Sequence, residues 1–312
     1  LVSRRVLLYT EMVTTGALLH GEPERFLAHH REEHPLAIQL GGSEPADMAR
    51  CARLAEAAGF DEVNMNVGCP SDRVQSGRFG ACLMTEPERV ADCIVAMGNA
   101  VDIPVTVKTR IGVDENDSYE ELRQFVDTVA AAGCRTFVIH ARKAWLHGLS
   151  PRENREVPPL DYGRVHRLKV DCPELNIVIN GGIRDLNQVE EQLAHVDGVM
   201  IGREAYRNPF MLAEADARLF GDRPRDRNQH DIVRAFLPYV KEQLEAGVYL
   251  SRMTRHLLGL FQGMPGARAW RRHLSENACR PGAGAEVIER ALTLVPENTS
   301  VLRQSTSATS AA

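Results

Sequence analysis

The chain has 312 residues, 44% of them hydrophobic and 25% charged, and a formal net charge of −5, which is the composition of an ordinary soluble protein with a large core. It has no run of about 18 apolar residues that could span a bilayer, and no charged-then-apolar signal segment opens it, so we expect neither a membrane-spanning nor a secreted protein. Seven cysteines without a CxxC pair argue against disulfides or a zinc cluster, and we expect a cytoplasmic protein with no bound metal.

Up to residue 203, short β-branched or apolar runs alternate with helical patterns at a spacing of roughly 30 residues, as repeated strand–helix units require. The expected strands are 5–13, 36–42, 62–70, 104–112, 136–142, 176–183 and 198–203. The expected helices between them are 45–59, 86–101, 118–133 and 185–196. This alternation predicts an α/β fold with a parallel sheet, specifically a (β/α)8 TIM barrel.

Seven strands leave an eight-stranded barrel one strand short. The last two strands end in the glycine-rich turns NGGI and IGR, and phosphate sites in such barrels favour the loops after strands seven and eight. The chain also begins with Leu1 rather than methionine. We therefore expect the first barrel strand and the loop after it to be missing from this chain.

From about residue 229 onward the sequence shows only helical periodicity, at 231–247, 252–264, 266–278 and 285–295. This pattern predicts a small all-helical C-terminal domain of three or four helices. We expect residues 1–222 to form the barrel domain, 223–303 the helical domain, and the small, polar residues 304–312 a disordered tail.

The charge changes sign between these two parts. Residues 1–222 carry 24 basic and 34 acidic side chains, a net charge of −10, whereas residues 223–312 carry 13 and 8, a net charge of +5. Between Arg252 and His273 there are five arginines, two histidines and no acid. This asymmetry favours a surface that binds a polyanion, although an ordinary solvated helix face is the alternative.

Polar residues follow almost every expected strand. In a barrel, such residues point into one shared opening at the carboxyl ends of the strands. Any one of them alone could be a capping residue, but together they indicate that something polar binds there. They are Glu11, Gln39, Asn66, Cys69, Lys108, Arg110, His140, Arg142, Asn180 and Arg203.

The turns NGG at 180–182 and GR at Gly202–Arg203 each open a helix, and each alone could be a simple tight connection. On consecutive strands they form a plausible nest of backbone N–H groups for a monophosphate. A planar cofactor with its phosphate there would place its ring within reach of Gln39, Lys108 and His140. If the ring is a flavin, Lys108 would stabilise the negative charge that develops on reduction.

Cys69 follows its strand directly and precedes a proline and a long, glycine-bearing polar loop. It could pack against apolar side chains, act as a nucleophile beside a base, or remain a thiol and act as a general acid. The residues alone leave the last two roles open.

Several motifs together resemble the tRNA-dihydrouridine synthase family, in particular its A subfamily. They are NVGCPS (66–71), SGRFGACLM (76–84), VKTRIGVD (107–114), HARKAWLHGLSPRENREVPPLDY (140–162), INGGIRD (179–185) and VMIGREAYRNP (199–209). The resemblance runs in order from about Val6 to Asn277. It implies an FMN-binding enzyme that uses NADPH to reduce the C5=C6 bond of uridines in the tRNA D-loop, with a helical domain that binds tRNA.

The resemblance also implies roles for single residues. Cys69 would give a proton to C5 of the uracil after hydride reaches C6. The FMN-binding residues would be Gln39, Lys108, His140, Asn180, Gly181, Gly182, Gly202 and Arg203. Our candidates for tRNA binding are Asn66, Arg142, Lys143, Arg152, Arg155, Arg268, Arg271 and Arg272. We expect a monomer whose partner is tRNA.

Two other functions are compatible with the same residues. A small-molecule oxidoreductase of the dihydroorotate dehydrogenase type also has a barrel, FMN and an acid or base at a strand end, but it does not explain the basic helical region. A protein that binds RNA through the basic region alone, without catalysis, is the other alternative.

Overall fold

The computed structural model describes residues 1–297, and the predicted tail at 304–312 lies outside them. The chain divides into two compact units. The sheet unit is Arg4–Gly202, and the helical unit is Leu1–Ser3 together with the chain from Arg203 onward. Residues 203–222, which we expected in the barrel domain, are in the helical unit by this division; the assignment of functions to domains stays a prediction.

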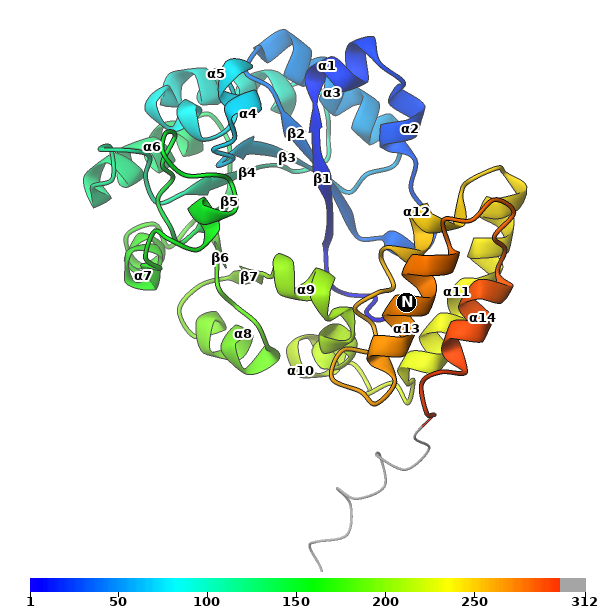
Figure 1. Ribbon diagram of the computed structural model, residues 1–312. Helices are drawn as coiled ribbons and strands as arrows, with labels where there is room; N and C mark the ends of the chain where they lie inside the picture. Colours follow the sequence, from blue (N-terminus) through cyan, green and yellow to red (C-terminus); the bar gives the residue numbers. More distant parts are fainter. Residues whose placement is uncertain (298–312) are drawn as a thin grey trace, which may run out of the picture. The chain divides into compact units, whose positions relative to one another are not determined.

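The sheet unit contains seven parallel strands that pair in chain order, each with the next. Helices cover the outside of this curled sheet (Figure 1). This arrangement confirms the predicted barrel class and the location of all seven strands. The strands are β1 (Leu8–Thr14), β2 (Leu36–Gly41), β3 (Glu62–Val67), β4 (Val105–Arg110), β5 (Thr136–His140), β6 (Asn176–Asn180) and β7 (Gly198–Met200).

The helices of the sheet unit begin at sequence signals that supply their first turn. Ser118 accepts from the backbone N–H of Glu121, and Glu121 bonds back to Ser118, so a capping box starts α6. Proline starts α3 and α5, where the missing N–H has no helical partner to lose. The helices are α1 (Thr15–His20), α2 (Pro23–Leu27), α3 (Pro45–Ala57), α4 (Asp72–Ser76), α5 (Pro87–Gly98), α6 (Tyr119–Ala131), α7 (Tyr162–Asp171) and α8 (Leu186–Leu193), with 3₁₀ turns η1 (Arg31–Glu33), η2 (Gly80–Thr85) and η3 (Glu153–Arg155).

The strand register aligns polar residues across neighbouring strands. Asn64 of β3 pairs with Gln39 of β2 on one side and with Thr106 of β4 on the other. Two residues further along, Asn66 is aligned with Lys108. Because side chains alternate between the two faces of a strand, these residues all share one face of the sheet.

The next level of that face lies at the carboxyl ends of the strands. Arg110 is aligned with His140, and His140 with Asn180, which is aligned in turn with Met200. The four strand ends therefore form one edge, as the sequence predicted for a parallel sheet.

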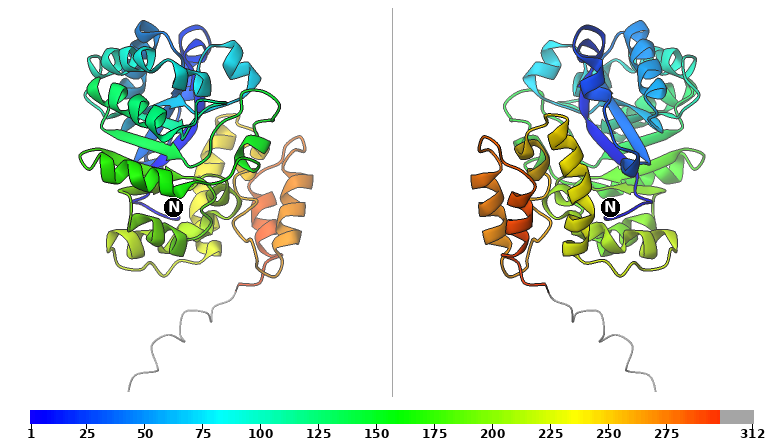
Figure 2. Two further views of the ribbon diagram at one scale, coloured as in Figure 1. Left: turned by 90° about the vertical axis from the view of Figure 1, so that its left-hand side faces the viewer. Right: turned by 90° about the vertical axis from the view of Figure 1, so that its right-hand side faces the viewer.

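The helical unit has its own apolar core, in which Trp270 and Phe261 are fully buried. Helix α13 lies against α12 and α14, and α11 lies against α12 (Figure 2). The predicted all-helical character of this region is confirmed as far as residue 297. The elements are α9 (Arg203–Arg207), η4 (Pro209–Glu214), α10 (Ala215–Phe220), α11 (Gln229–Glu245), α12 (Leu250–Thr254), α13 (Ala267–Asn277) and α14 (Glu286–Leu292). Within residues 1–297, no helix combines the length and the apolar character needed to cross a bilayer.

The helix predicted at 252–264 is wrong over most of its length, because α12 ends at Thr254 and a series of turns follows. Gly259 explains part of this difference. A Cβ atom on Gly259 would lie 2.0 Å from the carbonyl oxygen of Arg207, so the two backbones approach more closely than any other residue allows. The close approach is a tertiary constraint, which helical periodicity does not reveal.

We expect Gly259→Ala to lower the free energy of unfolding by about 1–3 kcal/mol, because the backbone of Arg207 must move to admit a methyl group. Gly98→Ala is the matched control, since nothing lies within 4 Å of its added Cβ, and alanine is the better helix former. Urea unfolding followed by circular dichroism measures both variants. Equal stability of Gly259→Ala and the wild type would show that the close approach is not tight.

Candidate active site

Cys69 lies two residues beyond β3, and its backbone is fixed on both sides. Its N–H donates to Oδ1 of Asn66 at 3.0 Å, and its carbonyl accepts from the N–H of Ala81 at 2.9 Å. The half-buried thiol lies 3.6 Å from Oγ of Ser71, within reach of a weak hydrogen bond. The thiol therefore has a fixed position at the edge of the strands, as an acid or nucleophile requires.

Arg110 joins the loop of Cys69 to the segment that follows β5. The side chain is only 3% exposed. Its Nε donates to the carbonyl of Gly68 at 2.9 Å, and its Nη1 donates to the carbonyls of Lys143 at 3.0 Å and Asn154 at 2.9 Å. Burial lowers the pKa of Arg110 to about 10, so the side chain is a buried cation at neutral pH. The sequence placed Arg110 at a strand end but gave it no role.

Lys108 presents its ammonium group to the same edge. Its Nζ donates to Oδ1 of Asn180 at 3.3 Å, and Nδ2 of Asn180 donates to the carbonyl of Met200 at 2.8 Å. Burial, and secondly the charge of Arg110, lower the pKa of Lys108 to about 8. An ammonium group has three donors, and only one is used among residues 1–297, so Lys108 can donate to a ligand.

His140 is a neutral side chain at this edge. Burial, and then the charge of Arg110, lower its pKa to about 2, so the ring stays unprotonated at physiological pH. Gly181 lies directly against it, because an added Cβ would be 2.8 Å from Cδ2 of the histidine. Within residues 1–297 the ring has no hydrogen bond to another residue, so its ring nitrogens are available to a ligand.

The two glycine turns follow aligned strand ends. Gly181 and Gly182 have φ angles of 122° and 73°, which favour glycine. Gly202 follows Met200 by two residues, as Gly182 follows Asn180, and an added Cβ on Gly202 would meet open space. Arg203 is the exposed first residue of α9 in the helical unit.

These residues suit the planar, phosphorylated cofactor that the sequence predicts. Lys108 offers unused donors, and a neutral His140 can donate or accept. Gln39 lies on the same face as Asn66 and accepts a hydrogen bond from its Nδ2 at 2.8 Å. A ring with carbonyl oxygens and ring nitrogens could bind to this set without leaving a buried polar group unpaired.

The predicted tRNA-binding residues of the sheet unit differ in their surroundings. Arg142 donates to the carbonyls of Glu156 and Pro158, and Lys143 forms an ion pair with Asp117 at 2.9 Å. Both side chains therefore hold the segment after β5 in place. In that same segment Arg152 and Arg155 are exposed, and Asn66 is buried beside Gln39.

In the helical unit, Arg268, Arg271 and Arg272 are exposed on α13. Residues three and four apart lie on the same side of a helix, so the three guanidinium groups share one face. Among residues 1–297 none of the three forms an ion pair or a side-chain hydrogen bond. Uncompensated cations on one face are what a polyanion requires.

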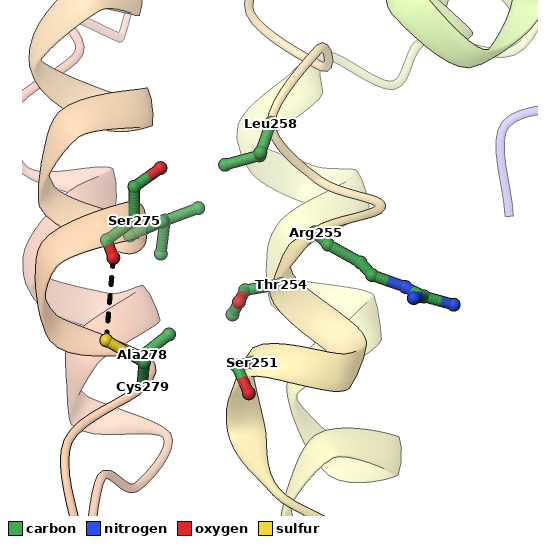
Figure 3. A pocket seen from close by; sticks show the side chains of 8 residues that line it. Ser251, Thr254, Arg255, Leu258, Ser275, Ala278 and Cys279 are labelled. Atoms are coloured by element: carbon green, nitrogen blue, oxygen red, sulfur yellow. Dashed lines mark hydrogen bonds between the residues drawn. The ribbon is translucent and has the colours of Figure 1, made fainter.

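A cleft of about 250 Å³ separates α13 from the segment that begins with α12. Ser275 and Cys279 face Ser251 and Thr254 across it, while the side chain of Arg255 extends away from α13 (Figure 3). Small polar side chains and two leucines, Leu258 and Leu274, line the gap, and no charged group converges on it. The cleft therefore does not resemble a built anion site.

A set of buried polar residues below this edge was not predicted from the sequence. Glu62, Asn64 and Thr106 are each less than 10% exposed and hydrogen bond with one another or with Gln39. The signal was present, because β3 reads Glu-Val-Asn-Met-Asn-Val, with polar and apolar residues alternating. In a strand that is buried throughout, such alternation indicates a polar interior face.

Comparison with known proteins gives a consistent result. The family described as Dihydrouridine synthase (Dus) matches residues 1–295. A tRNA-dihydrouridine(20/20a) synthase of Vibrio vulnificus is 60% identical over 96% of this chain and 92% of its own length. Proteins of the same name from Shewanella oneidensis and Escherichia coli K12 are 63% and 60% identical, over 93% and 95% of this chain and 87% and 86% of their own lengths.

We expect His140 to destabilise the folded protein in acid. Its pKa is about 2 in the folded state and about 6.5 when unfolded, so between these values only the unfolded state binds the proton, and stability falls as pH falls below 6.5. The unfolding free energy of the wild type relative to His140→Gln should therefore drop by about 2 kcal/mol between pH 7.5 and 5.0. Urea titrations at both pH values measure this difference, and a constant difference would contradict a buried neutral ring.

Proposed function

Because the chain belongs to the dihydrouridine synthase family, we propose that it reduces the C5=C6 bond of uridine to dihydrouridine in the D-loop of tRNA. Its similarity to relatives named for positions 20 and 20a supports assignment to the A subfamily and to these two uridines. The family match favours this reaction over the dihydroorotate dehydrogenase type and over RNA binding without catalysis.

The observation that carries the proposal is the position of the Cys69 thiol. Its backbone is fixed by Asn66 and Ala81, and the thiol lies near the cations Lys108 and Arg110 at the carboxyl edge of the sheet. Hydride addition at C6 of uracil leaves negative charge on C5 and O4. A thiol acid can give its proton to C5, while a nearby cation stabilises the charge on O4.

We assign FMN as the cofactor and NADPH as the reductant, and FMN, when bound, supplies the hydride that C6 receives. Gln39, Lys108, His140 and Asn180 would contact the ring, since their polar groups share one face of the sheet. The N–H groups of Gly181, Gly182 and Gly202, with Arg203, would bind the phosphate. Within the part of the chain that the structure describes, two donors of Lys108 and the ring nitrogens of His140 have no protein partner, which supports this assignment.

The tRNA contacts follow from the geometry of the reaction. A uracil must leave the stack of the D-loop to reach the sheet edge, so other surfaces must hold the rest of the tRNA. We propose that Arg268, Arg271 and Arg272 bind phosphates, because they are exposed and unpaired within residues 1–297. Asn66 would contact the base, and Arg142, Lys143, Arg152 and Arg155 would shape or contact the RNA path beside it.

We expect Cys69→Ala to keep bound FMN but to lose dihydrouridine formation by at least about 100-fold, the usual contribution of a positioned acid. The measurement is mass spectrometry of nucleosides from tRNA of a strain that lacks its own synthase, after incubation with each variant. Cys82→Ala is the matched control, because this cysteine is also partly buried, lies in η2, and donates its thiol proton to the carbonyl of Phe79 at 3.1 Å. Turnover by Cys69→Ala close to the wild-type rate would remove its role as the acid.

We expect the double variant Arg268→Glu and Arg271→Glu to weaken tRNA binding and to flatten its dependence on salt, because two phosphate contacts are lost. Filter binding at several salt concentrations gives the slope of log Kd against log salt. Arg290→Glu changes the charge on an exposed residue of α14 and serves as the control. A wild-type slope in the double variant would place the tRNA footprint elsewhere.

A further inference from the structure

A chain of hydrogen bonds begins at the loop of Cys69. Oδ1 of Asn66 accepts from the backbone N–H groups of Gly68 at 3.1 Å and of Cys69 at 3.0 Å. A backbone N–H group can only donate, so the side-chain oxygen of Asn66 must face the loop. Its Nδ2 is therefore directed away from the loop, where it donates to Oε1 of Gln39 at 2.8 Å.

The chain continues with the same polarity through the sheet unit. Nε2 of Gln39 donates to Oδ1 of Asn64 at 2.8 Å, and Nδ2 of Asn64 donates to Oγ1 of Thr106 at 2.8 Å. Each amide accepts with its oxygen and must donate with its nitrogen. The hydroxyl of Thr106 accepts from Asn64, and its own proton is donated to Oε1 of Glu62 at 2.6 Å.

The chain ends on the buried carboxyl group of Glu62, at the amino end of β3. The same Oε1 atom accepts from the hydroxyl of Tyr9 at 2.7 Å, so both neighbours of Glu62 are donors. Burial raises the pKa of Tyr9 further above its ordinary value, and Tyr9 therefore remains a donor. With backbone donors at one end and this acceptor at the other, only one orientation of each amide satisfies every bond.

We propose that Glu62, Asn64 and Thr106 are positioning residues for the reaction, which hold Gln39, Asn66 and the Cys69 loop in a single geometry from inside the sheet unit. None of the three lies at a carboxyl end of a strand. This inference rests on the proposed function, since Gln39 and Asn66 are there assigned to the cofactor and the base. Beyond that function, Glu62, at the opposite end of β3, determines the orientation of the amide groups of Gln39 and Asn66.

Breaking one of these hydrogen bonds should alter the position of the Cys69 loop. Without an acceptor at position 106, Nδ2 of Asn64 is buried without a partner, an unfavourable state that drives the amide to turn. Turning Asn64 removes the acceptor of Gln39, and Gln39 then no longer fixes Asn66. The loop that Asn66 holds becomes less well fixed.

Thr106→Val removes the hydroxyl and keeps the shape of the side chain, and Thr106→Ser restores the hydroxyl. Tyr9→Phe is the matched control, since it also removes one hydrogen bond to Oε1 of Glu62 but leaves the chain to Cys69 intact. The full-length holoenzyme is alkylated with iodoacetamide, and peptide mass spectrometry gives the rate at Cys69, with the exposed Cys279 as an internal reference. The kcat and KM for tRNA are measured in parallel.

We expect Thr106→Val to change the alkylation rate of Cys69 at least threefold and to lower kcat about tenfold, with KM for tRNA within twofold of the wild type. Thr106→Ser and Tyr9→Phe should stay within twofold in all three quantities. If Thr106→Val does not fold, Thr106→Cys is used, because its thiol is a weak donor and acceptor of similar size.

Two results would overturn the inference. One is wild-type alkylation and kcat in folded Thr106→Val, and the other is an equal effect of Tyr9→Phe, which would indicate a general loss of stability. Alkylation of Cys69 does not depend on the substrate. A wild-type protein that forms no dihydrouridine would therefore refute the proposed function without deciding the role of Thr106.

Discussion

The parallel, in-order pairing of seven strands is the constraint on which the candidate site depends. It brings all the carboxyl ends to one edge, and the register then decides which side chains are neighbours. Lys108 is beside Asn66 because β3 and β4 are aligned there, and His140 lies between Arg110 and Asn180 for the same reason. A shift of a single residue in any pair would turn these side chains to the opposite face.

Two cations at this edge, the buried Arg110 and the partly buried Lys108, give the site its electrostatic character. Lys108 and Arg110 lie two residues apart on one strand, and the charge of Arg110 contributes to the lowered pKa of Lys108 and of His140. Arg110 is stabilised by three backbone carbonyls, whereas the side chain of Lys108 makes one long hydrogen bond among the described residues. Such an edge favours a ligand that brings negative charge or develops it during a reaction, because that charge offsets the cost of burying the cations.

Much of this could be predicted from the sequence because it depends on local pattern. Apolar period and glycine turns located the strands, and strand order placed His140 and Asn180 at one edge. Lys108 and Gln39, which we expected at the same edge, lie on the same face but two and four residues further into the sheet. Features that depend on tertiary contact could not be predicted. Periodicity predicted a helix up to residue 264, but α12 ends at Thr254. Beyond that end, Gly259 closely approaches the backbone of Arg207. The partners of Arg142 and Lys143 come from two different loops, after β5 and after β4, whose paths the sequence does not specify.

Arg110 bonds to Gly68, next to the thiol, and also to Lys143 and Asn154, in the segment that carries Arg152 and Arg155. One rigid guanidinium plane thus anchors two loops that are far apart in sequence. Displacement of one loop strains the bonds to the other, so the two are energetically linked. Such linkage is reciprocal. A ligand that binds the segment of Arg152 and Arg155 also restricts the motion of the thiol, and a ligand bound beside the thiol restricts that segment in return.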